Sequence, residues 1–393
     1  MSRVVVLLCL CICYAVGFEV IWNIPSKQCK NVNPSEYNVT VNQFNNFWGD
    51  KVVLLYETFG LFPFCASEQK VGEKKPECIP VNGGVPQAAN LSAHLEKAAK
   101  DLESAIPDPN FDGYGVIDYE AWRPLYDLNW SSRRIYQRYS RTLLERDHAK
   151  MNPHELEHLA RETFDTAARE FMVETLKLAK KMRPKGKWGF WEYPLCDYSA
   201  GYNQSECLAY YDDYNAQLSY IPENADALYP SIYFYGDDPS EGRLKHAYAR
   251  LKQTYNYAAK FNKNLRIIPY IKIEYSPSDS VDADFYSKND LCASIKYPME
   301  LGVEAVIIWS SSYRMKQRCN GLEEYLKNQL GPFATEVKRK AKKCRESHCN
   351  NNGRCSTKEI TIPDECHLGH TIQNPTCICD EGFTGEQCQN QIR

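Results

Sequence analysis

Two carboxylates carry the clearest chemical signal in this sequence. Asp118 and Glu120 follow the apolar run Gly115-Val116-Ile117. On a strand, residues two apart point to the same side, with Cα atoms about 6.5 Å apart. Two carboxyl groups this close cannot both ionise easily, so the pKa of one rises and that group can act as a general acid, as cleavage of a glycosidic bond requires. The spacing leaves an alternative open, in which the pair caps the next helix or binds Arg123.

Residues 154–158, His-Glu-Leu-Glu-His, form a second motif of chemical interest. They match H-E-x-x-H, in which two histidines one helical turn apart bind zinc and the glutamate acts as a base. No Gly-x-x-His continues the motif, because Arg161 is the third residue after His158. The motif also lies near the start of a long helical segment, where exposed glutamate and histidine are common. We therefore expect no metal site.

The carboxylate pair lies at the end of the third of seven β-type runs, which alternate with helical segments. The runs are 18–24, 52–56, 115–119, 188–193, 228–235, 267–275 and 305–310, and the clearest helical segments are 92–106, 153–182, 242–262 and 291–301. Near-continuous apolar strands separated by helices indicate an α/β fold with a parallel sheet covered on both faces. Seven such units over about 310 residues favour a barrel, in which the carboxyl ends of the strands form the active-site face.

The composition is that of an ordinary globular protein. The chain has 393 residues, of which 43% are apolar and 25% charged, and its net charge of −3 gives no basic field for nucleic acid.

Residues 1–17 combine Arg3, the apolar run Val4–Val16 and the small residues Ala15 and Gly17, which is the pattern of a signal peptide. An uncleaved anchor is the alternative. No later stretch has spanning length and the C-terminus is polar, so we expect a secreted protein without a membrane anchor.

Cysteines and glycosylation sequons fit the same route. Cys9, Cys11 and Cys13 leave with the signal peptide, so fourteen of the 17 cysteines remain, an even number in an oxidising compartment. Four N-x-S/T sequons predict glycosylation, at Asn38, Asn90, Asn129 and Asn203.

Residues 344–388 form a separate cysteine-rich unit. Its cysteines have the spacing C-x4-C-x5-C…C-x-C-x8-C, with glycines and an aromatic residue between the last two. This spacing resembles an EGF-like module, which depends on disulfides because it is too small for an apolar core. The resemblance implies the pairs Cys344–Cys355, Cys349–Cys377 and Cys379–Cys388, rather than a zinc knuckle with a nearby histidine. Residues 336–343 are predicted to be a helical linker and residues 389–393 a short tail.

The segment around the carboxylate pair resembles the signature of the animal hyaluronidases, a family of glycoside hydrolases. It reads Phe-Asp-Gly-x-Gly-Val-Ile-Asp-x-Glu-x-Trp-Arg-Pro over residues 111–124. Further stretches that resemble the family are Trp22-Asn23-x-Pro25, Asn82-Gly83-Gly84, Lys187-Trp188-Gly189-Phe190, residues 227–233 and Ile308-Trp309. The resemblance covers nearly all of 18–335. It implies a distorted (β/α) TIM-like barrel of about seven parallel strands there, and an EGF-like tail also occurs in the family.

The resemblance implies a secreted endo-β-N-acetylhexosaminidase that cuts the β-1,4 bonds of hyaluronan, with chondroitin as a second substrate, by a retaining, substrate-assisted reaction. Glu120 would be the acid and base, and Asp118 would orient and stabilise the 2-acetamido group of the substrate, whose carbonyl oxygen is the nucleophile. The sugars would also contact Tyr233, Trp309, Ser231, Trp191 and Tyr270. For the aromatic residues the alternative is a place in the core. The reaction needs no cofactor, and we expect a monomer.

The same resemblance implies the disulfides Cys29–Cys319 and Cys196–Cys207. Cys65–Cys78 is suggested only by proximity along the chain, and Cys292–Cys366 could then join the barrel to the tail. The sequence alone does not settle this connectivity.

Some residues depart from the family pattern. Trp191 stands where the family usually has a pocket tyrosine, and Ser276 stands where an acid is frequent. The arginine that would meet the carboxylates of the polymer aligns only loosely, near Arg250. These departures keep a second interpretation open, a catalytically weak glycosaminoglycan-binding protein on the same fold. The intact pair of Asp118 and Glu120 counts against it.

Overall fold

The computed structural model describes residues 17–43, 46–66, 77–281, 284–357, 368–369, 372 and 374–392. Residues 1–16 of the expected signal peptide and Cys366 of the expected pair Cys292–Cys366 lie outside these residues. Among the helices that are described, none is long and apolar enough to cross a membrane.

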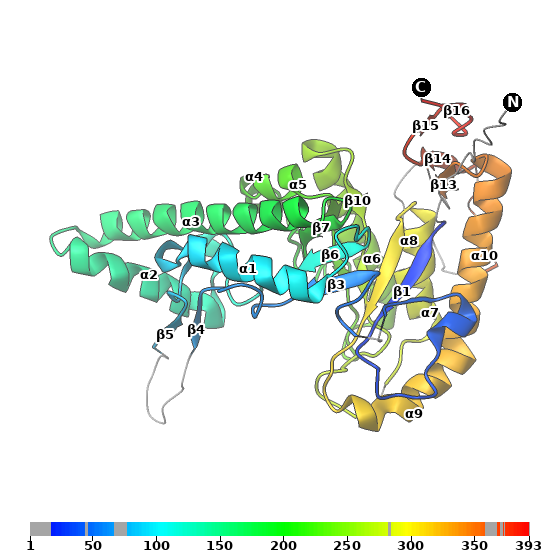
Figure 1. Ribbon diagram of the computed structural model, residues 1–393, viewed down its shortest axis with the longest axis horizontal. Coiled ribbons are helices and arrows are strands. Elements are labelled where there is room, and N and C mark those ends of the chain that lie inside the picture. The colour runs from blue at the N-terminus through cyan, green and yellow to red at the C-terminus, as the bar shows by residue number, and fades with distance from the viewer. Residues whose placement is uncertain are drawn as a thin grey trace, which may run out of the picture.

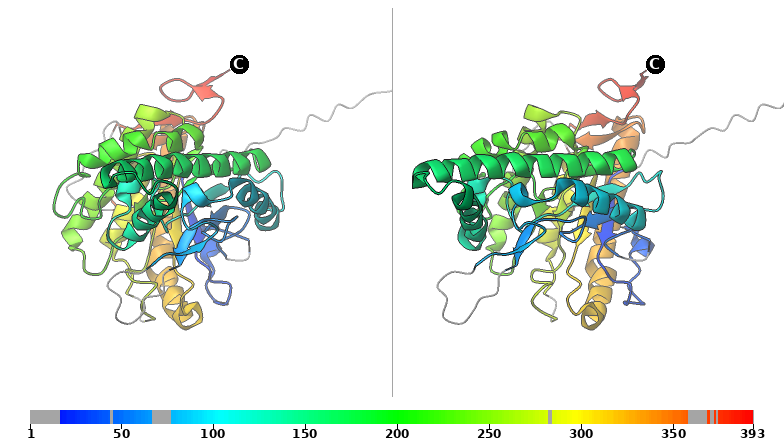
Figure 2. Two further views of the ribbon diagram at one scale, coloured as in Figure 1. Left: turned by 90° about the vertical axis from the view of Figure 1, so that its left-hand side faces the viewer. Right: turned by 60° about the vertical axis from the view of Figure 1, so that its left-hand side comes forward.

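Parallel strands at seven positions form the barrel (Figures 1 and 2). In chain order they are β1 (Glu19–Asn23), β3 (Val52–Leu55), β6 (Tyr114–Ile117), β7 (Lys187–Phe190), the broken strand β8 (Ala227–Leu228) and β9 (Ser231–Ile232), the broken strand β10 (Arg266–Ile267) and β11 (Tyr270–Ile271), and β12 (Ala305–Trp309). β3, β6 and β7 pair in this order as one parallel sheet. A parallel bridge between Trp191 and Tyr229 connects the end of β7 to the broken strand β8–β9. β9, β11, β12 and β1 then pair in this order. The prediction of a parallel barrel is confirmed.

The barrel is distorted between β1 and β3, where the described residues form no ladder. The short strand β2 (Thr40–Val41) pairs with β1 instead. Next to β2, the buried side chain of Asn42 bonds to both backbone groups of Val52, donating to its carbonyl (2.9 Å) and accepting from its N–H (2.7 Å). One amide side chain thus satisfies the backbone groups that a neighbouring strand would otherwise pair.

Helices cover the outside of the barrel. They are α1 (Leu91–Ala105), α2 (Arg134–Asp147), α3 (Pro153–Met182), α4 (Tyr210–Gln217), α5 (Tyr220–Asn224), α6 (Ser240–Phe261), α7 (Lys288–Leu291), α8 (Tyr297–Glu300), α9 (Met315–Tyr325) and α10 (Gly331–His348). α2 and α3 form a long hairpin that projects from the barrel (Figure 1). α3 begins where the sequence predicts. The side chain of Asn152 accepts hydrogen bonds from two N–H groups of the first turn, and Pro153 suits the first helical position because proline has no backbone N–H that would need a partner.

One disulfide, Cys29–Cys319, joins segments 290 positions apart, and the other five in the described residues close local loops of 9 to 28 positions. The described residues contain Cys29–Cys319, Cys65–Cys78, Cys196–Cys207, Cys344–Cys355, Cys349–Cys377 and Cys379–Cys388, the pairings expected above. Cys65–Cys78 links the hairpin of β4 (Phe64–Ala66) and β5 (Ile79–Val81). Cys292 is also disulfide-bonded.

The C-terminal unit consists of two short antiparallel ladders, β13 (Gly353–Ser356) with β14 (Thr376–Cys379) and β15 (Phe383–Thr384) with β16 (Asn390–Gln391). It docks at the amino end of β12: Arg354 Nε donates to the carbonyl of Gly302 (2.6 Å), and Ser356 Oγ to that of Leu301 (2.8 Å). Figure 1 shows the unit at one end of α10. The linker predicted at 336–343 is not separate, because α10 continues through Cys344 to His348. The unit therefore lies on the face opposite the carboxyl ends of the strands.

Truncation after Lys343, with Cys292→Ala to avoid a lone thiol, should lower the Tm but keep kcat on short oligosaccharides. The reason is that the truncation uncovers Phe18, Met299 and Val303, which are buried beside the unit, without touching the opposite face. A fall of at least about 3 °C in calorimetry is expected. Loss of kcat in a truncated protein shown to be folded would contradict this separation of roles.

Three of the four predicted glycosylation sites, Asn38, Asn90 and Asn203, are exposed. The fourth, Asn129, is fully buried. Its side-chain oxygen accepts from the N–H of Arg123 (2.8 Å), and its amide nitrogen donates to the carbonyl of Arg123 (2.9 Å). A glycan on this nitrogen would break the turn that follows the carboxylate pair. The structure therefore contradicts the prediction for Asn129.

Peptide mapping of the secreted protein should find Asn129 unmodified. Asn129→Ala should lower the Tm by about 5 °C, because the buried N–H of Arg123 loses its acceptor. Asn203→Gln is the matched control, because it removes an exposed sequon. Its Tm should equal that of wild-type protein that carries no glycan. A glycan on Asn129 would show that this turn is built differently.

Candidate active site

Inward-pointing side chains form layers inside the barrel, because positions two apart along a strand point to the same side. One layer is apolar and buried and includes Ile21, Leu54, Val116, Tyr270 and Ile307. Two residues further along the same strands, at their carboxyl ends, stand Asn23, Tyr56, Asp118, Lys272 and Trp309. Trp191 and Tyr233 pack on the same cluster. Seven strand ends thus place polar and aromatic side chains in one layer.

Asp118 forms part of the floor of this layer. It follows β6 directly, and its backbone N–H donates to the carbonyl of Leu55 (2.8 Å). The side chain is buried, and its Oδ1 atom accepts no hydrogen bond from any described residue. Burial raises the pKa of Asp118 well above its usual range, and the negative charges of Glu120 and Glu57 raise it further. The site therefore presents an acceptor oxygen that the protein leaves for another donor.

Glu120 stands two residues beyond Asp118 and is only half-buried. Its backbone N–H donates to Glu57 Oε1 (2.9 Å), and its backbone carbonyl accepts from Arg133 Nε (3.2 Å). These bonds fix the backbone without using the carboxyl group. Burial raises the pKa of Glu120, Arg123 opposes this, and the negative charges of Glu192 and Glu57 add to the increase. A carboxyl group that holds its proton at higher pH and remains accessible is suited to general acid catalysis.

Aromatic rings form one wall beside the carboxylates. Tyr233 lies between two tryptophans, with its ring centroid 6.1 Å from that of Trp191 and 6.0 Å from that of Trp309. Trp309 Nε1 donates to the hydroxyl of Tyr56 (2.9 Å), which fixes the orientation of the indole. All three rings are partly exposed. Such rings stack well on the apolar faces of sugars.

Two expected contact residues lie deeper than the sequence analysis placed them. Tyr270 is fully buried in the apolar layer, so it supports the site and does not line an accessible groove. Ser231 is buried, and its hydroxyl donates to Glu192. Arg250 is also buried and binds Glu192 (2.8 Å), so it is not an exposed contact for carboxylates of a polymer.

Sequence reasoning missed Tyr56, Glu57, Glu192 and Lys272. Lys272 has its Nζ atom 3.9 Å from the ring centroid of Tyr235 and 2.8 Å from the carbonyl of Tyr275, and burial lowers its pKa to about 8. Their positions in the sequence could have identified these residues, because each lies one or two residues after the end of a barrel strand. Applied to every strand and not only to β6, that rule selects them all.

No group of three or more His, Cys, Asp or Glu residues in the described part of the chain has the geometry of a metal site. The H-E-x-x-H motif lies near the start of α3 with both histidines exposed, and His158 is 4.0 Å from Glu162. The motif is thus a stretch of solvated helix surface.

A parallel barrel with two carboxyl groups at a strand end, beside a wall of aromatic rings, defines a glycoside hydrolase of the (β/α)-barrel class. The family model described as hyaluronidase, glycoside hydrolase family 56, matches residues 10–376. The chain belongs to the hyaluronidase family.

Individual relatives agree with this assignment. The chain is 31% identical over 388 residues to the chondroitin hydrolase of Caenorhabditis elegans, covering 95% of this chain and 81% of the relative. It is 32% identical to human hyaluronidase-1, covering 86% of this chain and 78% of the relative. The solved structure of bee venom hyaluronidase in complex with a hyaluronic acid tetramer matches with a TM-score of 0.73 at 33% identity, covering 81% of this chain and 99% of that chain.

Trp191→Ala should lower kcat/KM by about tenfold or more, because the partly exposed ring beside Tyr233 would no longer contact the sugar. Trp191→Tyr, which restores the family residue, should raise kcat/KM by up to about tenfold if the hydroxyl regains a hydrogen bond.

Trp188→Phe is the control, because Trp188 lies on β7, which directly precedes Trp191, but is fully buried. It should lower the Tm and leave kcat/KM near the wild-type value. If the Trp191 variants changed only the Tm, Trp191 would be a core residue and not part of the wall.

Proposed function

We propose that the protein is a secreted, monomeric endo-β-N-acetylhexosaminidase that cuts the β-1,4 bonds of hyaluronan, with chondroitin as a second substrate. The observation that carries this proposal is the buried Oδ1 atom of Asp118, which has no hydrogen-bond partner among the described residues, beside the more accessible Glu120. A 2-acetamido sugar supplies the missing donor, its amide N–H. The relatives named hyaluronidase and chondroitin hydrolase support the choice of polymers.

The reaction starts with Glu120 protonated. Glu120 donates its proton to the glycosidic oxygen while the carbonyl oxygen of the substrate's own acetamido group attacks the anomeric carbon, and the bond to the leaving sugar breaks. An oxazolinium ion forms, whose positive charge the carboxylate of Asp118 stabilises. Glu120, now ionised, takes a proton from water as the water attacks the same carbon, and the bond from this carbon to the acetamido oxygen breaks, which restores the acetamido group. Two displacements at one carbon retain its configuration.

The aromatic wall would orient the sugar for this attack. The ring of Tyr233 stands between the two tryptophans, so its hydroxyl could hydrogen-bond to the acetamido group while the rings stack on the pyranose. Held in this way, the carbonyl oxygen and the anomeric carbon stay within reacting distance, which supplies much of the rate. No cofactor takes part in these steps.

Secretion is supported by the disulfides of the described residues, since such bonds persist in oxidising compartments. Binding of the polymer by Trp191 and Trp309 without turnover would instead support the second interpretation, a glycosaminoglycan-binding protein. Incubation with hyaluronan oligomers of defined length, followed by sizing of the products, decides between the two. Early proton NMR spectra of the products should show the β anomer.

Glu120→Gln should lower kcat by at least about two to three orders of magnitude while binding of the polymer is kept, because an amide cannot donate the proton. Asp118→Asn should also lower kcat strongly, because a neutral amide does not stabilise the oxazolinium charge. Asp127→Asn, which removes an exposed carboxylate in the next loop, is the control and should keep full activity. A Glu120→Gln variant with a tenth of the wild-type kcat would place the acid elsewhere.

A further inference from the structure

Two exposed tyrosines stand next to the aromatic wall and have no part in the proposed reaction. Tyr198 lies in the loop after β7 and is 60% exposed, and Tyr235 lies three residues after β9 and is 44% exposed. Both line one small pocket together with Tyr233, the middle ring of the wall. A large ring left in water gives up the free energy that its burial would provide, so exposed rings gathered beside a site indicate a binding surface.

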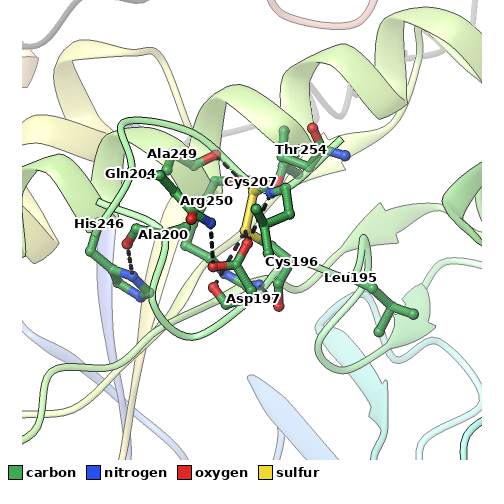
Figure 3. Close-up of a disulfide and its surroundings, with 12 residues drawn as sticks. Leu195, Cys196, Asp197, Ala200, Gln204, Cys207, His246, Ala249, Arg250 and Thr254 are labelled. Atoms are coloured by element: carbon green, nitrogen blue, oxygen red, sulfur yellow. Dashed lines mark hydrogen bonds between the residues drawn. A yellow bond between two sulfur atoms is a disulfide. The ribbon is translucent and has the colours of Figure 1, made fainter. Parts of the chain in front are cut away.

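The loop that carries Tyr198 is held in place on both sides of this residue. The Cys196–Cys207 disulfide closes the loop, and Figure 3 shows it against α6, the helix of His246 and Arg250. Nη1 of Arg250 donates to the carbonyl of Cys196 (3.4 Å), and Nδ1 of His246 bonds to the carbonyl of Ala200 (2.8 Å). The loop is therefore fixed by buried side chains, while the ring of Tyr198 stays in solvent.

Tyr235 is fixed in a different way. Its backbone N–H donates to Oδ2 of Asp238 (2.7 Å), and its carbonyl accepts from Nη2 of Arg243 (3.1 Å). The Nζ atom of the buried Lys272 lies 3.9 Å from the centroid of the ring, so a cation–π contact holds the ring as well. Because almost half of the residue is still exposed, a ligand can reach the ring without moving it.

The inner part of the pocket is polar. Ser231, His246 and Arg250 also line it, and all three are buried. The pocket thus has exposed aromatic rings at its opening and polar groups deeper inside. This combination suits a sugar, whose ring presents C–H groups on its faces and hydroxyl groups around its edge.

We propose that Tyr198 and Tyr235 form a further sugar subsite, in which their rings stack on the hexuronate next to the N-acetylhexosamine at the bond that is cut. This inference rests on the function proposed above and deepens it. The pocket shares Tyr233 with the aromatic wall, so a sugar in the pocket would be bonded directly to the sugar on the wall. In hyaluronan and in chondroitin, every N-acetylhexosamine has hexuronates as its neighbours, which determines the occupant.

Rings that are already fixed lose little conformational freedom when a sugar binds, so most of the stacking free energy appears as affinity. Neither ring contacts the reacting atoms in this arrangement. The subsite therefore binds the substrate and the transition state about equally, and its loss should raise KM and leave kcat within about twofold of the wild-type value.

The test is calorimetric binding of a hyaluronan hexasaccharide to Glu120→Gln protein, which does not consume the ligand. In this background, Tyr198→Ala and Tyr235→Ala should each raise the Kd by about three- to tenfold, because one ring no longer contacts the sugar. Tyr198→Phe and Tyr235→Phe keep the rings and should recover most of the affinity. In the active enzyme, the two alanine variants should raise KM on the same hexasaccharide.

Tyr210→Ala is the matched control, because Tyr210 is also exposed and begins α4 just after the same disulfide loop, but does not line the pocket. It should leave the Kd unchanged. An unchanged Kd in both alanine variants would overturn the subsite, and a lower Tm with that result would make the rings a cover for the buried polar groups. Wild-type protein that fails to cut hyaluronan oligomers would overturn the proposed function, while the binding series would still decide on the subsite.

Discussion

The alternation of side chains along parallel strands is the constraint on which the site depends. Inside a barrel every second residue points inward, and all strands run in the same direction, so their last inward residues meet at one end. Here the apolar layer that contains Val116 and Ile307 supports the layer that contains Asp118 and Trp309. A one-residue slip of any strand would turn its functional side chain toward the helices. The buried apolar layer therefore fixes the register of the polar and aromatic layer.

The same geometry creates an electrostatic problem. Carboxylates from three strand ends, Glu57, Asp118 with Glu120, and Glu192, gather where burial weakens the screening of their charges. Their repulsion is relieved when a carboxyl group keeps its proton, which is the state that general acid catalysis requires. In the proposed reaction, this repulsion between carboxylates would favour the protonated state of the acid.

The strands, the long helix α3 and the carboxylate pair could be predicted from the sequence, because each depends on a local pattern of apolar residues or on one motif. The burial of Glu192 could not, since it depends on Arg250, 58 positions further along the chain, and on Ser231 of another strand. The depth of Tyr270 was likewise hidden, because alternation gives the side of a strand but not the layer. The sequon at Asn129 failed for a related reason, since the motif does not report burial.

Buried arginines explain how loops without an apolar core can hold such a site. Arg250 binds the carbonyls of Ser231 and Cys196, Arg243 those of Tyr235 and Asp238, and Arg318 those of Ser311 and Tyr313. Each arginine is itself paired with a buried carboxylate, Glu192, Asp290 or Glu274. Guanidinium groups suit this task, because their five fixed donors can bind a carboxylate and several carbonyls at once. The desolvation of such pairs makes them poor sources of stability, so their value lies in fixing the geometry of the loops that follow the strands.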